Sequence, residues 1–127
     1  MTGARLSLVA VLVPDYAAGL AFYVGLLGFR LVDDIDQGRK RWVVVEPPGG
    51  GCRLLLARAE GAAQEAALGN QTGGRVGFFL QTDDFGRDHA AMLAAGVTFE
   101  EPPRHEPYGR VAVWRDPFGN RWDLIGP

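Results

Sequence analysis

The chain repeats one order of elements at a spacing of about seventy residues, and this repeat constrains its fold more than any other feature. In the first half, an apolar run over residues 6–13 predicts a buried strand. Asp15 can then cap a helix over residues 16–27, and Gly28 is suited to end it. The three runs that follow predict strands over residues 29–36, 39–46 and 52–58.

The second half repeats this order. A strand is predicted over residues 76–82, Asp83 and Asp84 can cap the next helix, and Gly96 closes that helix. The last three predicted strands span residues 97–100, 110–116 and 120–125. We therefore predict a single domain over residues 1–127, in which a linker over residues 59–74, with room for a short helix, joins modules 5–58 and 75–127.

Each module has one helix to cover four strands, so one face of each sheet lacks a cover within its own module. We expect an α+β fold in which duplicated βαβββ modules form mixed sheets that curl around a groove, with the helices outside. An ordinary two-layer α+β sandwich without a groove is the alternative.

The final hairpin carries a carboxylate into an otherwise apolar sheet. Residues 108–124 read YGRVAVWRDPFGNRWDL, which are two alternating strands joined by a tight Asp-Pro-Phe-Gly-Asn turn. The alternation places Arg121, Asp123 and Ile125 on one face of the second strand. Because a buried charge is costly without a partner, Asp123 is predicted either to face a wet functional cavity or to be neutralised by Arg121 and its neighbours.

Composition narrows the kinds of partner. The 127 residues are 47% hydrophobic and carry a formal net charge of -2, so no basic excess indicates nucleic acid or an anionic membrane. The single cysteine, Cys52, excludes an intrachain disulfide, and no Cys/His cluster has zinc spacing. We expect a cytoplasmic protein without a signal peptide or membrane span, whose partner is a small molecule.

Three segments resemble the glyoxalase/bleomycin-resistance/extradiol-dioxygenase superfamily, also called the vicinal oxygen chelate superfamily. They are VPDYAAGLAFYVGLLGF in the first half, and FFLQTDDFGRDHAAMLAAGVTF and DPFGNRWDL in the second. The resemblance covers nearly the whole chain and implies the fold described above. It does not imply one activity, because the family includes isomerases, dioxygenases, thiol transferases and metal-free drug-sequestering proteins.

The resemblance also implies four metal-ligand positions, which in this sequence are Leu8, Leu55, Gly77 and Asp123. Only Asp123 has a ligating side chain, and one carboxylate does not hold a catalytic divalent ion. We therefore expect no metal and no other cofactor.

The predicted site residues are aromatic or polar side chains of the expected groove. The candidates for ligand binding are Trp42, Phe79, Gln81, Tyr108, Trp114, Arg121 and Asp123. The candidates for a catalytic base are His105, in a loop expected to border the groove, and Glu46, at a strand end. For each of these candidates, an ordinary structural role is the alternative. The other histidine, His89, is expected to pack on the buried face of its helix.

The leading hypothesis is a homodimeric, metal-free protein that binds an aromatic or amphipathic compound, as bleomycin-resistance proteins do. The competing hypothesis is a glyoxalase-like lyase or isomerase, or a dioxygenase. Such an enzyme would recruit a metal through atypical ligands such as His105, Glu106 and Asp123, or use His105 or Glu46 as a base without metal. A regulatory module whose groove is filled by a partner is a third hypothesis.

Overall fold

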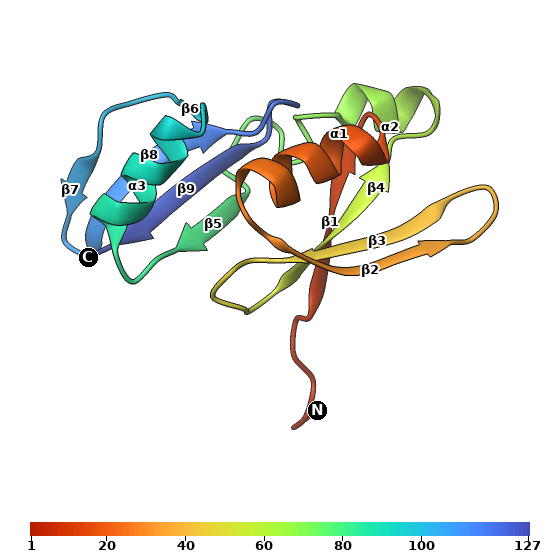
Figure 1. The fold of residues 1–127 in the computed structure, drawn as a ribbon, viewed down its shortest axis with the longest axis horizontal. Helices are drawn as coiled ribbons and strands as arrows, with labels where there is room; N and C mark the ends of the chain where they lie inside the picture. The colour runs from red at the N-terminus through yellow and green to blue at the C-terminus, as the bar shows by residue number, and fades with distance from the viewer. The chain divides into compact units, whose positions relative to one another are not determined.

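The computed structural model describes residues 1–127, and the chain forms two compact units, Met1–Glu65 and Ala66–Pro127. The first unit contains β1 (Leu8–Val13), α1 (Tyr16–Leu20), the π-helical segment η1 (Ala21–Leu26), β2 (Arg30–Asp36), β3 (Arg41–Glu46) and β4 (Arg53–Arg58). Its sheet has the order β1-β4-β3-β2, with β1 and β4 parallel and the other pairs antiparallel (Figure 1).

The second unit repeats this topology. A helix, α2 (Gly61–Ala67), spans the boundary between the units. The second unit then contains β5 (Phe78–Gln81), α3 (Phe85–Ala94), β6 (Thr98–Phe99), β7 (Arg104–Glu106), β8 (Gly109–Arg115) and β9 (Arg121–Gly126). The sheet order is β5-β9-β8-β6, with β5 and β9 parallel, as β1 and β4 are. The predicted mixed α+β class and the repeated βαβββ order are confirmed.

The helix entries and exits follow the predicted chemistry. The Asp15 carboxylate accepts from the Ala18 N–H at 2.7 Å, and Asp84 accepts from Arg87 N–H at 3.0 Å. Gly28 and Gly96 adopt φ of 76° and 91°, the left-handed conformation that ends a helix.

The first helix differs from its prediction in its second half, where the backbone becomes π-helical. Leu27 N–H donates to Phe22 O at 2.9 Å, five residues back. Apolar spacing over so few turns does not distinguish a repeat of 3.6 residues from a wider one, so the sequence predicts the helix and not its winding.

Strand β7 corrects a second expectation, because the sequence predicts a loop over residues 102–108. Arg104 pairs with Val111 and His105 with Arg110. Two prolines, Pro103 and Pro107, flank this three-residue strand, and such a strand is too short to show an alternating pattern.

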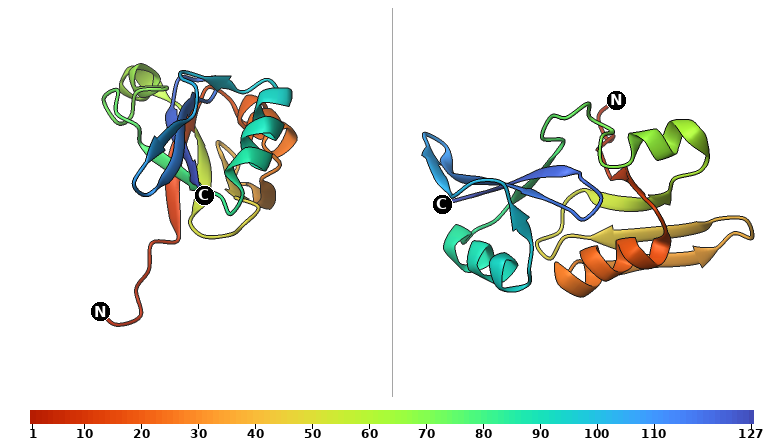
Figure 2. Two further views of the ribbon diagram at one scale, coloured as in Figure 1. Left: turned by 90° about the vertical axis from the view of Figure 1, so that its left-hand side faces the viewer. Right: turned by 90° about the horizontal axis from the view of Figure 1, so that it is seen from above.

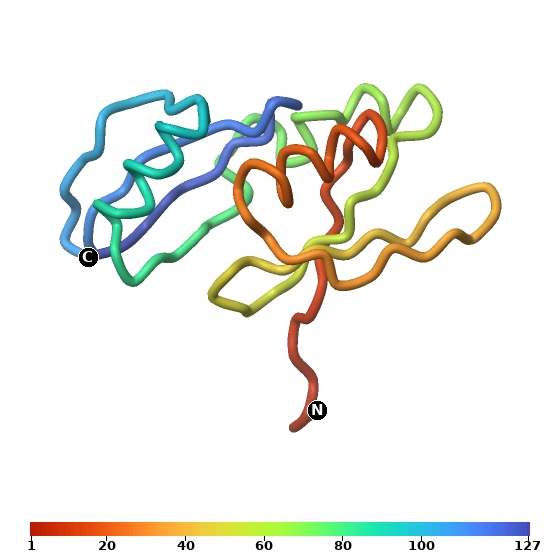
Figure 3. Tube along the Cα trace, viewed as in Figure 1, coloured from red at the N-terminus to blue at the C-terminus, as the bar shows by residue number.

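In the first unit, one face of the sheet packs against α1. The buried side chains of that face are Val11, Val13, Val43, Val45, Leu54 and Leu56. Gly19 lets the helix approach closely, because a Cβ at this position would lie 3.1 Å from Val13 Cγ1 and 3.2 Å from Leu56 Cδ1. The connection between β3 and β4 is a wide glycine-rich loop (Figure 3).

We expect Gly19→Leu to destabilise the protein by about 2 kcal/mol, because the added side chain would overpack the contact between helix and sheet. Gly25→Leu is the matched control on the same helical segment, where the nearest atom to an added Cβ is Leu20 O at 3.9 Å. Urea unfolding should show the loss only for Gly19→Leu. Equal stability of the two variants would contradict the close packing of α1.

In the second unit, α3 covers one face of the sheet, as Figure 2 shows. Beneath it the Trp114 and Trp122 rings stack with centroids 4.9 Å apart, and His89 lies 5.4 Å from the Phe85 ring and 4.6 Å from the Phe99 ring. The packing role expected for His89 is confirmed. None of the helices of either unit has the length and apolar content needed to span a bilayer.

Candidate functional site

Asp123 is a buried carboxylate in the middle of β9, on the sheet face opposite α3. Its register neighbours are Val113 on β8 and Phe79 on β5, so these three side chains share that face. Asp123 is 9% exposed, and its Oδ1 atom is buried without a hydrogen-bond partner. Because buried polar atoms are nearly always paired, an unpaired carboxylate oxygen at this position is unusual.

Burial raises the pKa of Asp123 above its ordinary value. The guanidinium groups of Arg104 and Arg121 act in the opposite direction, and the Glu101 carboxylate adds to the rise. The loss of hydration therefore outweighs the nearby positive charges.

Arg121 forms no ion pair with Asp123, although its charge acts on the Asp123 carboxylate. Its Nε and Nη2 atoms donate to Glu100 at 2.8 and 3.2 Å, and Nη1 donates to Gly74 O at 2.8 Å. Arg115 lies 3.1 Å from the same Glu100 carboxylate. The hydrogen bonds from these two guanidinium groups hold the pKa of Glu100 below its usual value.

A second arginine on this face is also bound by carboxylates. Arg104 lies opposite Val111, which places it on the Asp123 side of the sheet. It donates to Glu101 at 2.5 Å and to Glu106 at 2.6 Å. The roles of Glu100, Glu101 and Arg104 are not apparent in the sequence, because their partners depend on how β6 and β7 pair with β8.

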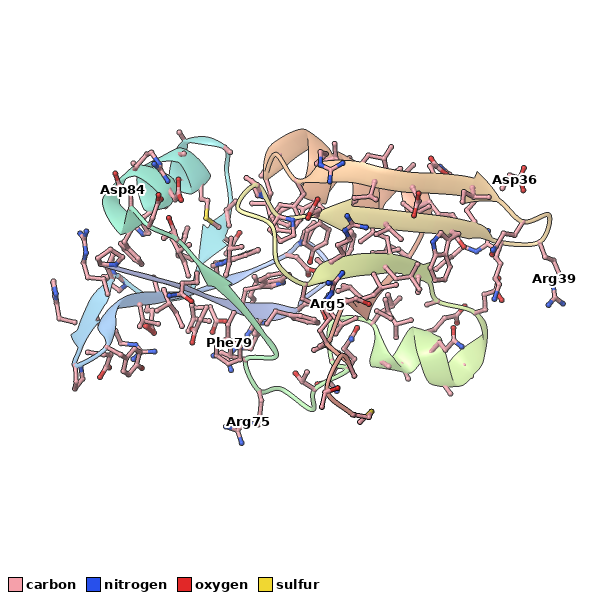
Figure 4. All side chains as sticks on the ribbon, turned by 90° about the horizontal axis from the view of Figure 1, so that it is seen from below. Arg5, Asp36, Arg39, Arg75, Phe79 and Asp84 are labelled. Atoms are coloured by element: carbon pink, nitrogen blue, oxygen red, sulfur yellow. The ribbon has the colours of Figure 1, made fainter.

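Three predicted ligand-binding residues are accessible in this unit. Phe79, labelled in Figure 4, is 62% exposed beside Asp123. Gln81 lies two residues farther along the same strand face and is exposed, and Tyr108 is 65% exposed in the β7–β8 turn. Of these side chains, Phe79 gives the face an apolar surface next to the buried acid.

Two other predicted residues lie elsewhere. Trp114 is fully buried beneath α3, so its ring has no surface to offer a ligand. His105 is exposed and pairs with Arg110, which puts its side chain on the face opposite Asp123. The structure therefore does not bring His105 and Asp123 together.

Glu46 and Trp42 belong to the first unit. Glu46 forms an ion pair with Arg30 and lies 3.8 Å from Arg53, so its carboxylate is already bound by two guanidinium groups. Trp42 is partly exposed and lines a pocket between β3 and β4.

The residues at the four family metal positions do not fit a divalent ion. The first unit offers Leu8 and Leu55, which have no donor atoms, and the second offers Gly77 and Asp123. A Cβ at Gly77 would lie 2.3 Å from Thr72 Cγ2, and Thr72 is fixed by a 2.7 Å hydrogen bond to Arg75 O. No three metal-ligating side chains gather anywhere in residues 1–127.

Comparisons with known proteins agree with this fold. An uncharacterized protein of Shewanella frigidimarina (strain NCIMB 400) is 50% identical over 120 residues, which are 92% of this chain and 89% of that protein. The crystal structure of TnmS3, described as an antibiotic binding protein from Streptomyces sp. CB03234, is 31% identical with a TM-score of 0.80 and covers 100% of this chain and 98% of its own. The crystal structure of UcmS2 is 28% identical with a TM-score of 0.84, and the match covers 96% of this chain and 97% of UcmS2.

The family comparison spans almost the whole sequence. The model of the family described as Glyoxalase/Bleomycin resistance protein/Dioxygenase superfamily matches residues 5–124. The resemblance seen in the sequence is thereby confirmed. This chain belongs to the Glyoxalase/Bleomycin resistance protein/Dioxygenase superfamily.

Proposed function

We propose that this protein binds a small aromatic or amphipathic molecule at the Asp123 face, without a divalent metal. The observation that carries the proposal is the buried, unpartnered Oδ1 atom of Asp123 beside the exposed ring of Phe79. An acceptor left unpaired in a protein interior costs about 1–3 kcal/mol, and a ligand N–H or O–H placed against it would recover that cost.

The charges of this face favour a cationic or neutral donor over an anion. The guanidinium groups of Arg104 and Arg121 are bound by Glu101, Glu106 and Glu100. Asp123 is the acidic group on the face that has no such partner. A ligand with an aromatic ring and an ammonium or hydroxyl group would place its ring on Phe79 and its donor at Asp123.

Relatives support binding as the role. TnmS3 is described as an antibiotic binding protein and is similar to this chain over its full length. The donor set at the family metal positions supports binding without metal, since three of the four residues have no ligating atom.

The competing proposal, an enzyme that acts as a lyase, isomerase or dioxygenase, has less support from the placement of its predicted groups. Glu46 is held by Arg30 and Arg53. His105 and Glu106 lie on opposite faces of β7, so the atypical ligand set does not converge.

Homodimer formation is part of the proposal. It is supported by exposed apolar side chains on the edge strand β2, namely Leu31 and Ile35. An exposed apolar edge of this kind is suited to a partner surface.

A thermal-shift series with matched probes tests the proposed binding. We expect naphthylmethylamine and naphthylmethanol to raise the melting temperature and methylnaphthalene to have little effect, because only the first two carry a donor for Asp123. Phe79→Ala should weaken the affinity for both by about tenfold, since it removes the stacking surface. Leu93→Ala, which removes an exposed apolar side chain from α3, is the control and should bind normally. Equal responses to all three probes, or no effect of Phe79→Ala, would contradict the proposal.

A further inference from the structure

Strands β3 and β4 form backbone hydrogen bonds over only part of their length. Their ladder contains only Val44 opposite Leu55 and Val45 opposite Leu54, whereas β1 pairs with β4 through six residues. In Figure 1, β4 runs toward α2 while the β2–β3 hairpin extends away from it. The sheet therefore opens between the Arg41 end of β3 and the Arg58 end of β4.

This opening forms a pocket of about 220 Å³. Leu55, Leu56 and Ala57 form its apolar part. The aromatic and polar side chains of its wall are Tyr16, Gln37, Lys40, Arg41, Trp42, Arg58, Glu60 and Gln64. All of these residues belong to the first unit, so the pocket is complete within residues 1–65.

Tyr16 is the buried polar group of the pocket. It is 7% exposed, and its hydroxyl oxygen accepts from the Arg41 N–H at 3.1 Å. A phenol can donate as well as accept, and no hydrogen bond from the Tyr16 O–H is formed within the chain. An acceptor atom in the pocket would complete its bonding.

Positive charge predominates in the wall. The guanidinium carbons of Arg41 and Arg58 lie 5.0 and 5.4 Å from the centre of the Tyr16 ring. Arg41 is held by Asp34 at 3.0 and 2.6 Å, and Arg58 by Glu60 at 2.8 Å, which fixes the position of both cations.

Lys40 supplies the unbalanced charge, because it takes part in no ion pair. Glu60 is the one acidic residue among the lining residues. Asp36 and Arg39 lie at the end of the β2–β3 hairpin, as Figure 4 shows, and neither lines the pocket. An anion therefore fits this wall better than a cation.

We propose that this pocket binds a small planar aromatic carboxylate. The ring would lie against Trp42 and the apolar side chains of β4, and the carboxylate would accept from the Tyr16 O–H near Lys40. A volume of about 220 Å³ is below the range of drug-sized sites and suits a single ring. All of its lining residues belong to the first unit, whereas Asp123 belongs to the second, and the proposed ligand has the opposite charge to the one proposed for Asp123.

Benzoate is the probe, and benzamide is its neutral isostere. Trp42 is the tryptophan that lines the pocket, whereas Trp114 and Trp122 are 0% and 3% exposed and do not meet the probe. A change in an indole N–H resonance or in tryptophan fluorescence on addition of benzoate therefore reports on Trp42. We expect benzoate to shift the Trp42 signal saturably and benzamide to bind at least about tenfold more weakly. Lys40→Gln should weaken benzoate binding about fivefold, and Tyr16→Phe should weaken it by a similar factor.

Arg39→Gln is the matched control, because it removes one exposed charge from the same hairpin outside the pocket wall. It should change the affinity by less than about twofold. Equal affinity for benzoate and benzamide, a shift without saturation, or unchanged binding in Lys40→Gln would overturn the proposal. None of these results depends on the probes or variants that test the Asp123 face, so the two proposals can fail separately.

Discussion

Asp116→Ala is expected to lower the free energy of unfolding by about 3 kcal/mol, because it leaves several buried donors without an acceptor. Asp116 is 4% exposed and accepts from Phe118 N–H at 3.0 Å, Asn120 N–H at 2.9 Å and Asn120 Nδ2 at 2.7 Å. These bonds fix the turn between β8 and β9, together with Gly119 at φ 103°. Urea unfolding followed by tryptophan fluorescence measures the loss.

Asp36→Ala is the matched control for this prediction. Asp36 also accepts from a turn amide, Gly38 N–H at 2.8 Å, but it is exposed, so water can replace the bond. Asp36→Ala should lower the free energy of unfolding by less than about 1 kcal/mol. Equal costs for the two substitutions would show that the β8–β9 turn does not depend on buried hydrogen bonds. Because β9 begins at this turn, Asp116→Ala should also loosen the position of Asp123.

Asp123→Asn is expected to change the pH dependence of stability. The folded pKa of Asp123 lies above its ordinary value, so the folded state holds the proton to higher pH than the unfolded state does. Its contribution is fully present below the unfolded pKa and is lost as pH rises through the folded pKa. The asparagine variant carries no such loss, so we expect it to gain stability relative to the native protein as pH rises from about 4 through the folded pKa of Asp123.

The measurement is urea unfolding of both proteins at a series of pH values. Asp34, Glu60, Asp88 and Glu100 have lowered pKa values, so their contributions are lost as pH falls. These contributions are common to both proteins and cancel in the difference. A difference in stability between the native protein and Asp123→Asn that does not change with pH would contradict the conclusion that burial disfavours the ionised form of Asp123.

Local rules in the sequence predict most of the fold. Aspartate caps, glycine exits and strand alternation depend on neighbours along the chain, and they identify the repeated βαβββ order and the face shared by Arg121 and Asp123. The winding of η1 and the existence of β7 depend on hydrogen bonding that the residue pattern does not encode.

The candidate site is predicted less completely, because side chains choose partners that are distant in sequence. Arg121 and Asp123 share a strand face, yet Arg121 binds Glu100, which is 21 residues away along the chain. Trp114 looks like a stacking residue in the sequence, but the register of β8 with β9 turns it toward α3 and Trp122. Position on a face could be predicted from alternation, whereas the choice of ion-pair partner could not.

The central claim is that the Asp123 face binds a small molecule without a divalent metal. Calorimetric titration of chelator-treated protein with naphthylmethylamine, repeated after addition of Zn²⁺ and on Asp123→Asn, tests it most directly. We expect saturable binding that Zn²⁺ leaves unchanged and that Asp123→Asn weakens by at least about tenfold, because the variant loses a charge-assisted hydrogen bond. Binding that appears only after the metal is added, or that is equally tight in Asp123→Asn, would contradict the account.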